Sequence, residues 1–158
     1  MRALHLAKRF FAALSISAPA PDDEAWAQTQ MLPGELALWR QMSNPDRRHA
    51  IGVARDVVTI LGADTERAVV AAALLHDVGK IDSGLGTLAR VPATVINRRT
   101  GNGRFARYRR HDEIGAELLA VAGSAATTVA WAREHHLSPQ RWTIDARVAE
   151  ALKQADDD

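Results

Sequence analysis

Hydrophobic residues recur at helical spacing along nearly the whole chain beyond residue 23, and no segment shows the two-residue alternation typical of a β-strand. Because the two periods place side chains on different faces, this pattern predicts an all-α fold. A length of 158 residues suits one hydrophobic core. We therefore expect a single-domain helical bundle, in which residues 1–44 form N-terminal helices that pack on a core made by residues 45–158.

Turn and capping residues divide this pattern into separate helices. Asp46 is the expected N-cap of one helix, Asp64 or Thr65 of the next and Asp145 of the last, because short polar side chains accept hydrogen bonds from free backbone N–H groups. Gly79 is the expected C-terminal stop of the helix that contains the apolar run 69–75. The expected helices cover residues 23–42 in one or two pieces, 46–61, 65–78, 85–99, 105–121, 124–137 and 146–155.

The first twenty residues fit two interpretations. Apolar residues between Ala3 and Leu14 form a stripe at helical spacing, which predicts an amphipathic helix. Alternatively, Lys8-Arg9 and the apolar run that follows resemble a short signal peptide. We favour the helix and, with it, a cytoplasmic protein. No apolar run approaches the roughly 20 residues of a transmembrane helix, so we expect no membrane span.

The composition narrows the chemistry that the chain can carry out. Cysteine is absent, which excludes disulfides, iron–sulfur clusters, thiolate zinc sites and a cysteine nucleophile. The net charge of +1 gives no general attraction to nucleic acid, and we expect no extended nucleic-acid partner. Arginines nevertheless gather between Arg90 and Arg110. They form either a phosphate-binding patch or, as we favour for most of them, a solvated charged face.

Histidines are the most informative residues of the chain, at positions 5, 49, 76, 111, 135 and 136. One histidine alone would indicate a surface or hydrogen-bonded core residue. His76-Asp77, however, directly follow the apolar run 69–75, where burying unpaired polar groups would be costly. A shared metal would satisfy several of these side chains at once. Adjacent residues such as His135-His136 point roughly 100° apart on a helix, so each pair can face two sides of a dinuclear site inside a bundle.

The residue types indicate which metals such a site would hold. Neutral imidazoles and carboxylates suit first-row divalent ions, so we expect iron or manganese, with zinc, nickel, cobalt or magnesium as alternatives. Asp77 is the candidate bridge, because the two oxygens of one carboxylate can bind two metals. Two metals roughly 3.5–4 Å apart can clamp a phosphoryl group and activate the attacking hydroxide.

The order of these residues resembles the HD-domain superfamily of metal-dependent phosphohydrolases. The segment Ala73–Lys80 is similar to the His-Asp core of that superfamily, and His111–Leu119 resembles the next helix in its HD-GYP branch of cyclic-dinucleotide phosphodiesterases. The resemblance spans about residues 45–157. It implies an HD-domain fold with the metal site in the bundle core. It also implies hydrolysis of a small phosphoester, either a nucleotide or a cyclic-dinucleotide-like molecule.

The resemblance implies roles for individual side chains. Two divalent metal ions would be held by His49, His76, Asp77, His111, His135, His136 and Asp156. Asp157 is the alternative to Asp156, and a frayed acidic terminus is the alternative for the whole tail. Lys80 matches the lysine that contacts the substrate phosphate and is, with Asp77, an expected catalytic residue. The alternative for Lys80 is a solvated lysine near a helix end.

Two arginines of the Arg-rich segment, Arg107 and Arg110, are further candidates for binding the substrate phosphate. At two other places the chain departs from the family pattern. Residues 137–142 read Leu-Ser-Pro-Gln-Arg-Trp where the HD-GYP branch carries its Gly-Tyr-Pro motif, so the resemblance does not extend to cyclic di-GMP specificity. Pro45 stands where some members carry a glutamate for a third metal, which predicts two metals.

Two other functions remain open at this point. Relatives of the same fold include diiron oxygenases, and the fold also occurs in non-catalytic signalling or binding modules. We favour the phosphohydrolase because the metal-ligand pattern is retained and the double histidine is typical of it. The oligomeric state is open as well.

Overall fold

A computed structural model describes residues 17–83 and 110–157 of the chain. These residues form α-helices and two short 3-10 helices, and they contain no strand, which confirms the all-α prediction. The elements are α2 (Pro21–Thr29), α3 (Pro33–Trp39), α4 (Asn44–Leu61), α5 (Arg67–Leu75), η1 (Val78–Ser83), α8 (His111–Val121), α9 (Ala126–Glu134), η2 (Pro139–Arg141) and α10 (Ala146–Asp157).

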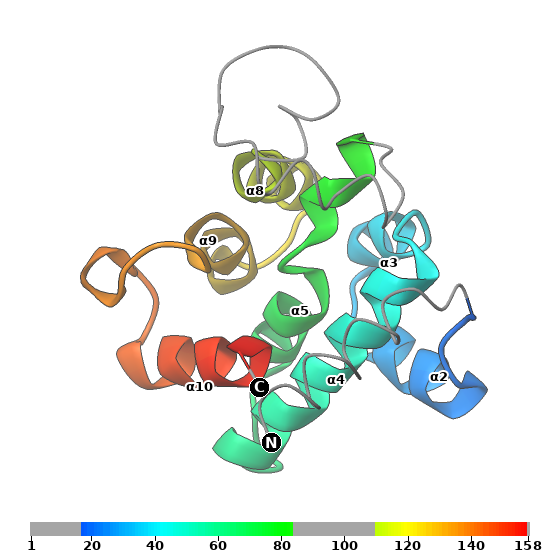
Figure 1. The fold of residues 1–158 in the computed structure, drawn as a ribbon, viewed down its shortest axis with the longest axis horizontal. Helices are drawn as coiled ribbons and strands as arrows, with labels where there is room; N and C mark the ends of the chain where they lie inside the picture. The colour runs from blue at the N-terminus through cyan, green and yellow to red at the C-terminus, as the bar shows by residue number, and fades with distance from the viewer. Residues whose placement is uncertain (1–16, 84–109, 158) are drawn as a thin grey trace, which may run out of the picture.

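Helix α5 is the central element of the bundle (Figure 1). It packs against α4 on one side and α9 on the other, and α8 lies beside α9. Helix α10 crosses back to pack against α4, while η1 continues from the end of α5 toward α8. This arrangement brings the end of α5, the start of α8 and the end of α9 into one region.

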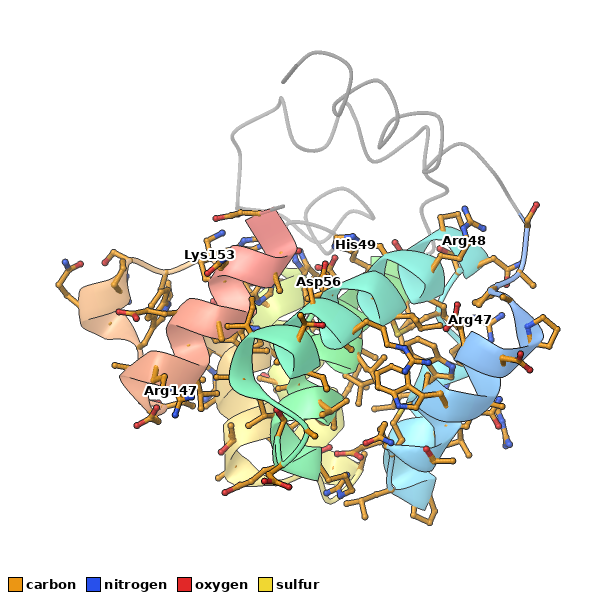
Figure 2. All side chains as sticks on the ribbon, turned by 90° about the horizontal axis from the view of Figure 1, so that it is seen from below. Arg47, Arg48, His49, Asp56, Arg147 and Lys153 are labelled. Atoms are coloured by element: carbon orange, nitrogen blue, oxygen red, sulfur yellow. The ribbon has the colours of Figure 1, made fainter. Side chains whose placement is uncertain are left out.

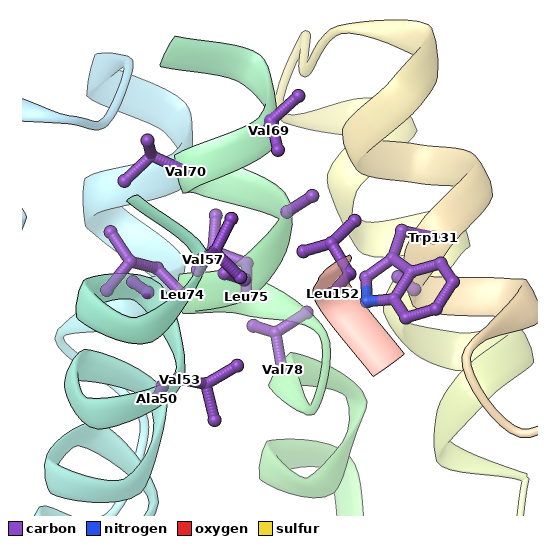
Figure 3. Close-up of a cluster of buried hydrophobic side chains, with 14 of the residues drawn as sticks. Ala50, Val53, Val57, Val69, Val70, Leu74, Leu75, Val78, Trp131 and Leu152 are labelled. Carbon is purple, nitrogen blue, oxygen red and sulfur yellow. The ribbon is translucent and has the colours of Figure 1, made fainter. Parts of the chain in front are cut away.

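Helix α5 is central because it is apolar on every face. All of its residues from Val69 to Leu75 are buried, and Leu74 and Leu75 are fully so. Figure 3 shows these side chains meeting Val57 of α4, Trp131 of α9 and Leu152 of α10. A helix without a polar face must lie inside the bundle, and each buried valine or leucine contributes about 1.5–3 kcal/mol. The chain that leaves α5 is therefore carried into the interior.

The end of α5 differs from the expected one. The helix stops at Leu75, and Gly79 lies inside η1 instead of ending a helix. A Cβ atom on Gly79 would lie only 1.9 Å from the carbonyl oxygen of His111 and 2.6 Å from the backbone nitrogen of Gly115. Gly79 is thus required for the close approach of η1 to α8, because any other residue would push the two backbones apart.

Of two expected N-cap residues, one is wrong and the other is confirmed. The N-cap of α4 is Ser43 and not Asp46: the Ser43 Oγ accepts a hydrogen bond from the backbone N–H of Asp46 at 3.3 Å. Asp46 therefore occupies the first turn, where a negative charge is favourable. The expected cap of α10 is confirmed, since the Asp145 Oδ1 accepts a hydrogen bond from the backbone N–H of Val148 at 3.1 Å.

Other helix limits also differ from the expected ones. Helix α5 begins at Arg67 with Glu66 at its N-cap, so neither Asp64 nor Thr65 caps it. The Thr65 hydroxyl donates instead to the carbonyl oxygen of Gly62 at 2.6 Å. Helix α9 is shorter at both ends than residues 124–137, as is common where helix ends pass into turns. The expected helix over residues 23–42 is divided into α2 and α3.

Helices α2 and α3 are tied to the bundle by buried polar contacts. The Glu24 Oε1 accepts hydrogen bonds from the Trp39 Nε1 at 2.8 Å and from Arg47 at 3.0 Å, which links α2, α3 and α4. Glu35 of α3 is fully buried and forms an ion pair with Arg67 of α5 at 3.1 Å. Buried charges require such partners, so these contacts fix how the N-terminal helices sit.

Several predictions fall outside the described residues. They concern the helix around residues 3–14, the helix over 85–99, the first part of the helix over 105–121, and Arg107. Over residues 17–83 and 110–157, no helix combines the length and the hydropathy needed to cross a bilayer.

Candidate metal centre

The side chains predicted to bind metal converge from five parts of the bundle. We call them the His–Asp cluster: His49 of α4, His76 and Asp77 after α5, His111 at the start of α8, His135 and His136 at the end of α9, and Asp156 of α10. Figure 2 shows His49 and Lys153 along one edge of the molecule, where α4 and the end of α10 lie together. The cluster lies where those helix ends meet.

Four members form a first group, which we call the α8–α9 group: Asp77, His111, His135 and His136. Their ligand atoms all lie within 4.8 Å of one another. The Asp77 Oδ1 is 3.1 Å from the His111 Nε2 and 3.8 Å from the His135 Nε2. The Nε2 atoms of His111 and His136 are 3.3 Å apart. Three nitrogens and one oxygen thus face a common point, which is a donor set that can hold a metal ion.

A second group, the α4–α5 group, consists of His49, His76 and Asp77, whose ligand atoms again lie within 4.8 Å of one another. The His76 Nε2 is 3.4 Å from the Asp77 Oδ2. Asp156 adjoins this group, with its Oδ1 3.0 Å from the His49 Nε2 and 3.6 Å from the His76 Nε2. Asp77 therefore belongs to both groups and turns a different oxygen toward each.

The two most deeply buried histidines are oriented by backbone carbonyl groups. The His76 Nδ1 lies 2.8 Å from the carbonyl oxygen of Ala73. The His135 Nδ1 lies 3.2 Å from that of Trp131 and 3.1 Å from that of Ala132. A carbonyl oxygen can only accept, so Nδ1 carries the hydrogen, and in a neutral ring the lone pair is on Nε2. Both Nε2 atoms face the cluster, as in metal-binding histidines held by a backbone acceptor.

The His135 Nε2 is a buried nitrogen atom that the described residues, 17–83 and 110–157, leave without a hydrogen-bond partner. Burial, followed by the nearby imidazoles of His76 and His136, lowers the pKa of His135 to about 2. The ring is then neutral at physiological pH and offers a lone pair. Burial and the neighbouring His111 lower the pKa of His136 as well. An unpartnered buried lone pair on a neutral imidazole fits a metal ion.

The carboxylates of the cluster stay ionised. Burial alone would raise the pKa of Asp77, but the charges of Lys80 and His76 hold it well below the usual range. Burial likewise opposes ionisation of Asp156, yet the hydrogen bond from His49 and the charge of His76 lower its pKa. For His76, burial lowers the pKa, but Asp77 and Asp156 outweigh it and raise the value to about 9. The two carboxylates thus stay ionised, and they can act as metal ligands once His76 has lost its proton.

The structure gives the two aspartates of the C-terminal tail different directions. Helix α10 continues through Asp157, so the tail is helical and not frayed. Asp156 faces the His–Asp cluster, whereas the Asp157 side chain is 62% exposed and pairs with Lys153 at 2.7 Å. Adjacent residues on a helix point about 100° apart, so only one of the two can face the cluster. That residue is Asp156.

The residues expected to bind phosphate lie in different places relative to the cluster. Lys80 forms an ion pair with the Asp77 Oδ2 at the margin of the cluster, and its side chain is 17% exposed. Arg110 is the N-cap residue of α8, directly before His111, and its Nε is buried without a hydrogen-bond partner in the described part of the chain. Arg107 lies outside the described residues.

The sequence analysis did not single out Glu134, a buried acidic residue beside the cluster. Glu134 ends α9 directly before His135 and is only 6% exposed. Both of its carboxylate oxygens bind Thr143, nine residues later. The one signal in the sequence is an acidic residue next to a double histidine, which by itself does not indicate burial.

A surface hollow of about 380 Å³ lies apart from the cluster, at the opposite end of α5. It is lined by Leu61, Thr65, Glu66, Val69, Thr127, Asp145, Arg147 and Val148. None of these residues belongs to the His–Asp cluster. The residues that line the hollow include no histidine and no group of converging metal ligands, so the hollow does not share the donor set of the cluster.

Comparison with known proteins yields one match, to a protein family. The family model described as the HD domain matches residues 47–157. The matched segment is most of the chain and contains every member of the His–Asp cluster. The match concerns the HD domain as a whole and does not distinguish the HD-GYP branch. No curated protein and no solved structure matches the chain.

Proposed function

The chain belongs to the HD-domain family, whose members are mostly metal-dependent phosphohydrolases, and we propose that it hydrolyses a phosphoester with two divalent metal ions. The proposed substrate is a small molecule, a nucleotide or a cyclic-dinucleotide-like phosphoester. The observation that supports the proposal most strongly is the position of Asp77, whose Oδ1 lies 3.1 Å from the His111 Nε2 and whose Oδ2 lies 3.4 Å from the His76 Nε2. Such a carboxylate is suited to bridge two metals.

In this proposal each group holds one metal ion. The α8–α9 group offers three imidazole nitrogens and the Asp77 Oδ1. The α4–α5 group, with Asp156, offers two imidazole nitrogens and two carboxylate oxygens. Donor sets of nitrogen and oxygen suit iron and manganese, with zinc, nickel, cobalt or magnesium as alternatives. A metal in the first group would also satisfy the unpartnered His135 Nε2.

The chemistry follows from the charges around the site. When bound, two metal ions supply Lewis-acid charge and lower the pKa of a bound water. The chain itself contributes the Lys80 ammonium, held beside Asp77, and the Arg110 guanidinium at the residue before His111. Negative charge grows on the phosphoryl oxygens in the transition state, and fixed cations stabilise it. Lys80 and Arg110 are therefore the proposed phosphate-binding residues, together with Arg107.

The experiment that tests the proposal is hydrolysis of bis-p-nitrophenyl phosphate and of nucleotides by the metal-loaded protein. The Asp77→Ala variant should lose hydrolysis together with at least one of two bound metals. The matched control is Asp157→Ala, because Asp157 is exposed and its Oδ1 pairs with Lys153 away from the cluster. Circular dichroism should show that both variants keep their helices. Undiminished hydrolysis by Asp77→Ala would overturn the proposed site.

Two further outcomes would replace the proposal with another function. Oxygen consumption in the presence of an inositol-like or phosphonate-like substrate would identify an oxygenase with an iron pair. Much less than one metal per chain after anaerobic purification would identify a non-catalytic module. Both measurements are made on the same preparation as the hydrolysis assay.

A further inference from the structure

The segment after the double histidine folds back onto the end of α9. The chain passes through η2 (Pro139–Arg141) and returns at Thr143. There the backbone N–H of Thr143 donates to the Glu134 Oε2 at 2.7 Å, and the Thr143 hydroxyl donates to the Glu134 Oε1 at 2.5 Å. One residue thus binds both oxygens of one carboxylate and closes residues 134–143 into a loop. We call this pair of hydrogen bonds the Glu134–Thr143 clamp.

The clamp is strong because of the environment of Glu134. The residue is 6% exposed, and each of its carboxylate oxygens accepts one of the two hydrogen bonds. Hydrogen bonds to an ionised group are stronger than neutral ones. Removing a donor would leave a buried carboxylate oxygen without its partner, which is unfavourable. The loop is therefore held in the position that satisfies Glu134.

An aromatic contact attaches the same loop at a second point. Trp142, the residue before Thr143, packs its ring edge-to-face on Trp131 with a centroid distance of 5.8 Å. Trp131 lies one helical turn before His135 and is 2% exposed. Because both attachments are on the last turn of α9, the loop cannot shift without disturbing the end of that helix.

His136 depends on this loop more than the other members of the α8–α9 group do. Helix α9 ends at Glu134, and His135 is its C-cap. The His135 ring is still anchored in the helix through its Nδ1, and His111 lies on the tightly packed start of α8. His136 lies beyond the last helical residue, in a turn closed by the hydrogen bond from the Leu137 N–H to the Glu134 carbonyl oxygen at 2.7 Å.

From this arrangement we infer that Glu134 is a positioning residue for His136, and that it acts through the Glu134–Thr143 clamp. The inference rests on the proposed function, because His136 has a catalytic task only if it binds a metal. The clamp holds the turn after α9 so that the His136 Nε2 stays 3.3 Å from the His111 Nε2. Loss of the clamp therefore affects the metal of the α8–α9 group and leaves that of the α4–α5 group in place.

The test compares Co²⁺ binding by the full chain and by Thr143→Val, followed by visible absorption and by metal analysis after dialysis. Valine keeps the shape of threonine and its backbone N–H, but it lacks the hydroxyl that donates to the Glu134 Oε1. We expect one of the two Co²⁺ ions to bind about 10–100-fold more weakly, as is common when a residue that orients a metal ligand is lost. His136→Ala should reproduce this change. Glu134→Ala, which removes both acceptor oxygens of the clamp, should also weaken the same ion.

The controls separate positioning from a general effect on the fold. Thr143→Ser keeps the hydroxyl and should restore both Co²⁺ affinities. Thr59→Val makes the same replacement at an exposed threonine whose hydroxyl donates only within α4, to the Arg55 carbonyl oxygen at 2.9 Å, and it should bind both ions normally. The Co²⁺ absorption bands of the remaining ion should match those of the wild type.

Each failure has its own meaning. If the wild type binds two ions and Thr143→Val binds both with unchanged affinity, the inference is overturned and the proposed function stands. If both ions are weakened equally, or the Tm falls without selective loss of one ion, the clamp has a general structural role and the inference is again overturned. If the wild type binds no Co²⁺, the proposed function fails, and the inference fails with it.

Discussion

The backbone of Gly79 packs so closely on His111 that a Cβ atom at Gly79 would lie 1.9 Å from the His111 carbonyl oxygen. This approach is what allows the start of α8 to reach Asp77. The His111 Nε2 consequently lies 3.1 Å from the Asp77 Oδ1. A hydrogen atom in place of a side chain thus sets the distance between two side chains of the candidate metal centre.

Gly79→Ala should therefore lower both stability and metal affinity. Relief of the clash must move η1 away from α8, and overpacking of this kind costs about 1–3 kcal/mol or more. Urea denaturation measures the free energy of unfolding, and Co²⁺ titration measures the affinity. Gly52→Ala is the matched control, because no atom lies within 4 Å of a Cβ atom there. That exposed helical position should gain about 0.5–1 kcal/mol. Equal stability of the two variants would contradict the role of Gly79.

Metal binding should release a proton from His76. In the metal-free protein the pKa of His76 is raised to about 9, since Asp77 and Asp156 outweigh the effect of burial. The ring is therefore charged at pH 7.5 and must lose its proton before Nε2 can bind a metal. Apparent affinity should rise as pH rises toward 9 and level off above it.

Calorimetry in two buffers of different ionisation enthalpy measures this release. We expect about one proton per chain at pH 7.5 and almost none from His135, whose pKa is lowered to about 2 by burial and its histidine neighbours. The His76→Gln variant should lose the release. Binding heats that are the same in both buffers would contradict the prediction.

Asp156 and Asp157 should respond differently to metal. Saturating metal stabilises a protein that binds it only when folded, by about 2.7 kcal/mol at a concentration 100 times the Kd. Asp156→Ala removes a carboxylate 3.0 Å from the His49 Nε2 and 3.6 Å from the His76 Nε2. Its metal-induced rise in Tm should be smaller than that of the wild type. Asp157→Ala should keep the full rise. The opposite order would assign the last ligand to Asp157.

Lys80→Ala should lower hydrolysis while both metals stay bound. Its ammonium lies at the Asp77 carboxylate but adds no ligand atom. Removing one charge that stabilises the transition state costs roughly 100–1,000-fold in kcat. Metal analysis of the same sample checks that two ions remain. Lys153→Ala, which removes an ammonium paired with Asp157 at 2.7 Å, should hydrolyse normally. Loss of metal in Lys80→Ala would mean that the lysine supports the site and does not bind phosphate.

Part of this structure could be predicted from local sequence alone. The run from Val69 to Leu75 is apolar on all faces, and such a helix can only be central, so the burial of His76 and Asp77 followed directly. The convergence of the distant histidines could not be predicted from periodicity, because periodicity indicates which face of a helix is apolar and not which helices are in contact. That prediction rested on the order of the residues and on their resemblance to a known family.

The predictions that failed concern choices that depend on tertiary contacts. Ser43 and Asp46 are both competent N-caps, and the helix begins at Asn44, so that Ser43 caps it and Asp46 falls in its first turn. Gly79 was interpreted as a helix stop, because its requirement for close approach comes from His111, far along the chain. Glu134 was not singled out, because its partner Thr143 lies across a loop whose path the sequence does not reveal.

The contacts of α2 and α3 determine how far the chain can be truncated from its N-terminus. The family match begins at residue 47, yet Trp39 is fully buried in the core and its Nε1 donates to Glu24. Arg47 depends on the same glutamate. A chain trimmed to residues 47–157 would expose apolar surface and leave Arg47 without its carboxylate. The stretch that the family model matches is thus shorter than the packed unit, which reaches back at least to α2.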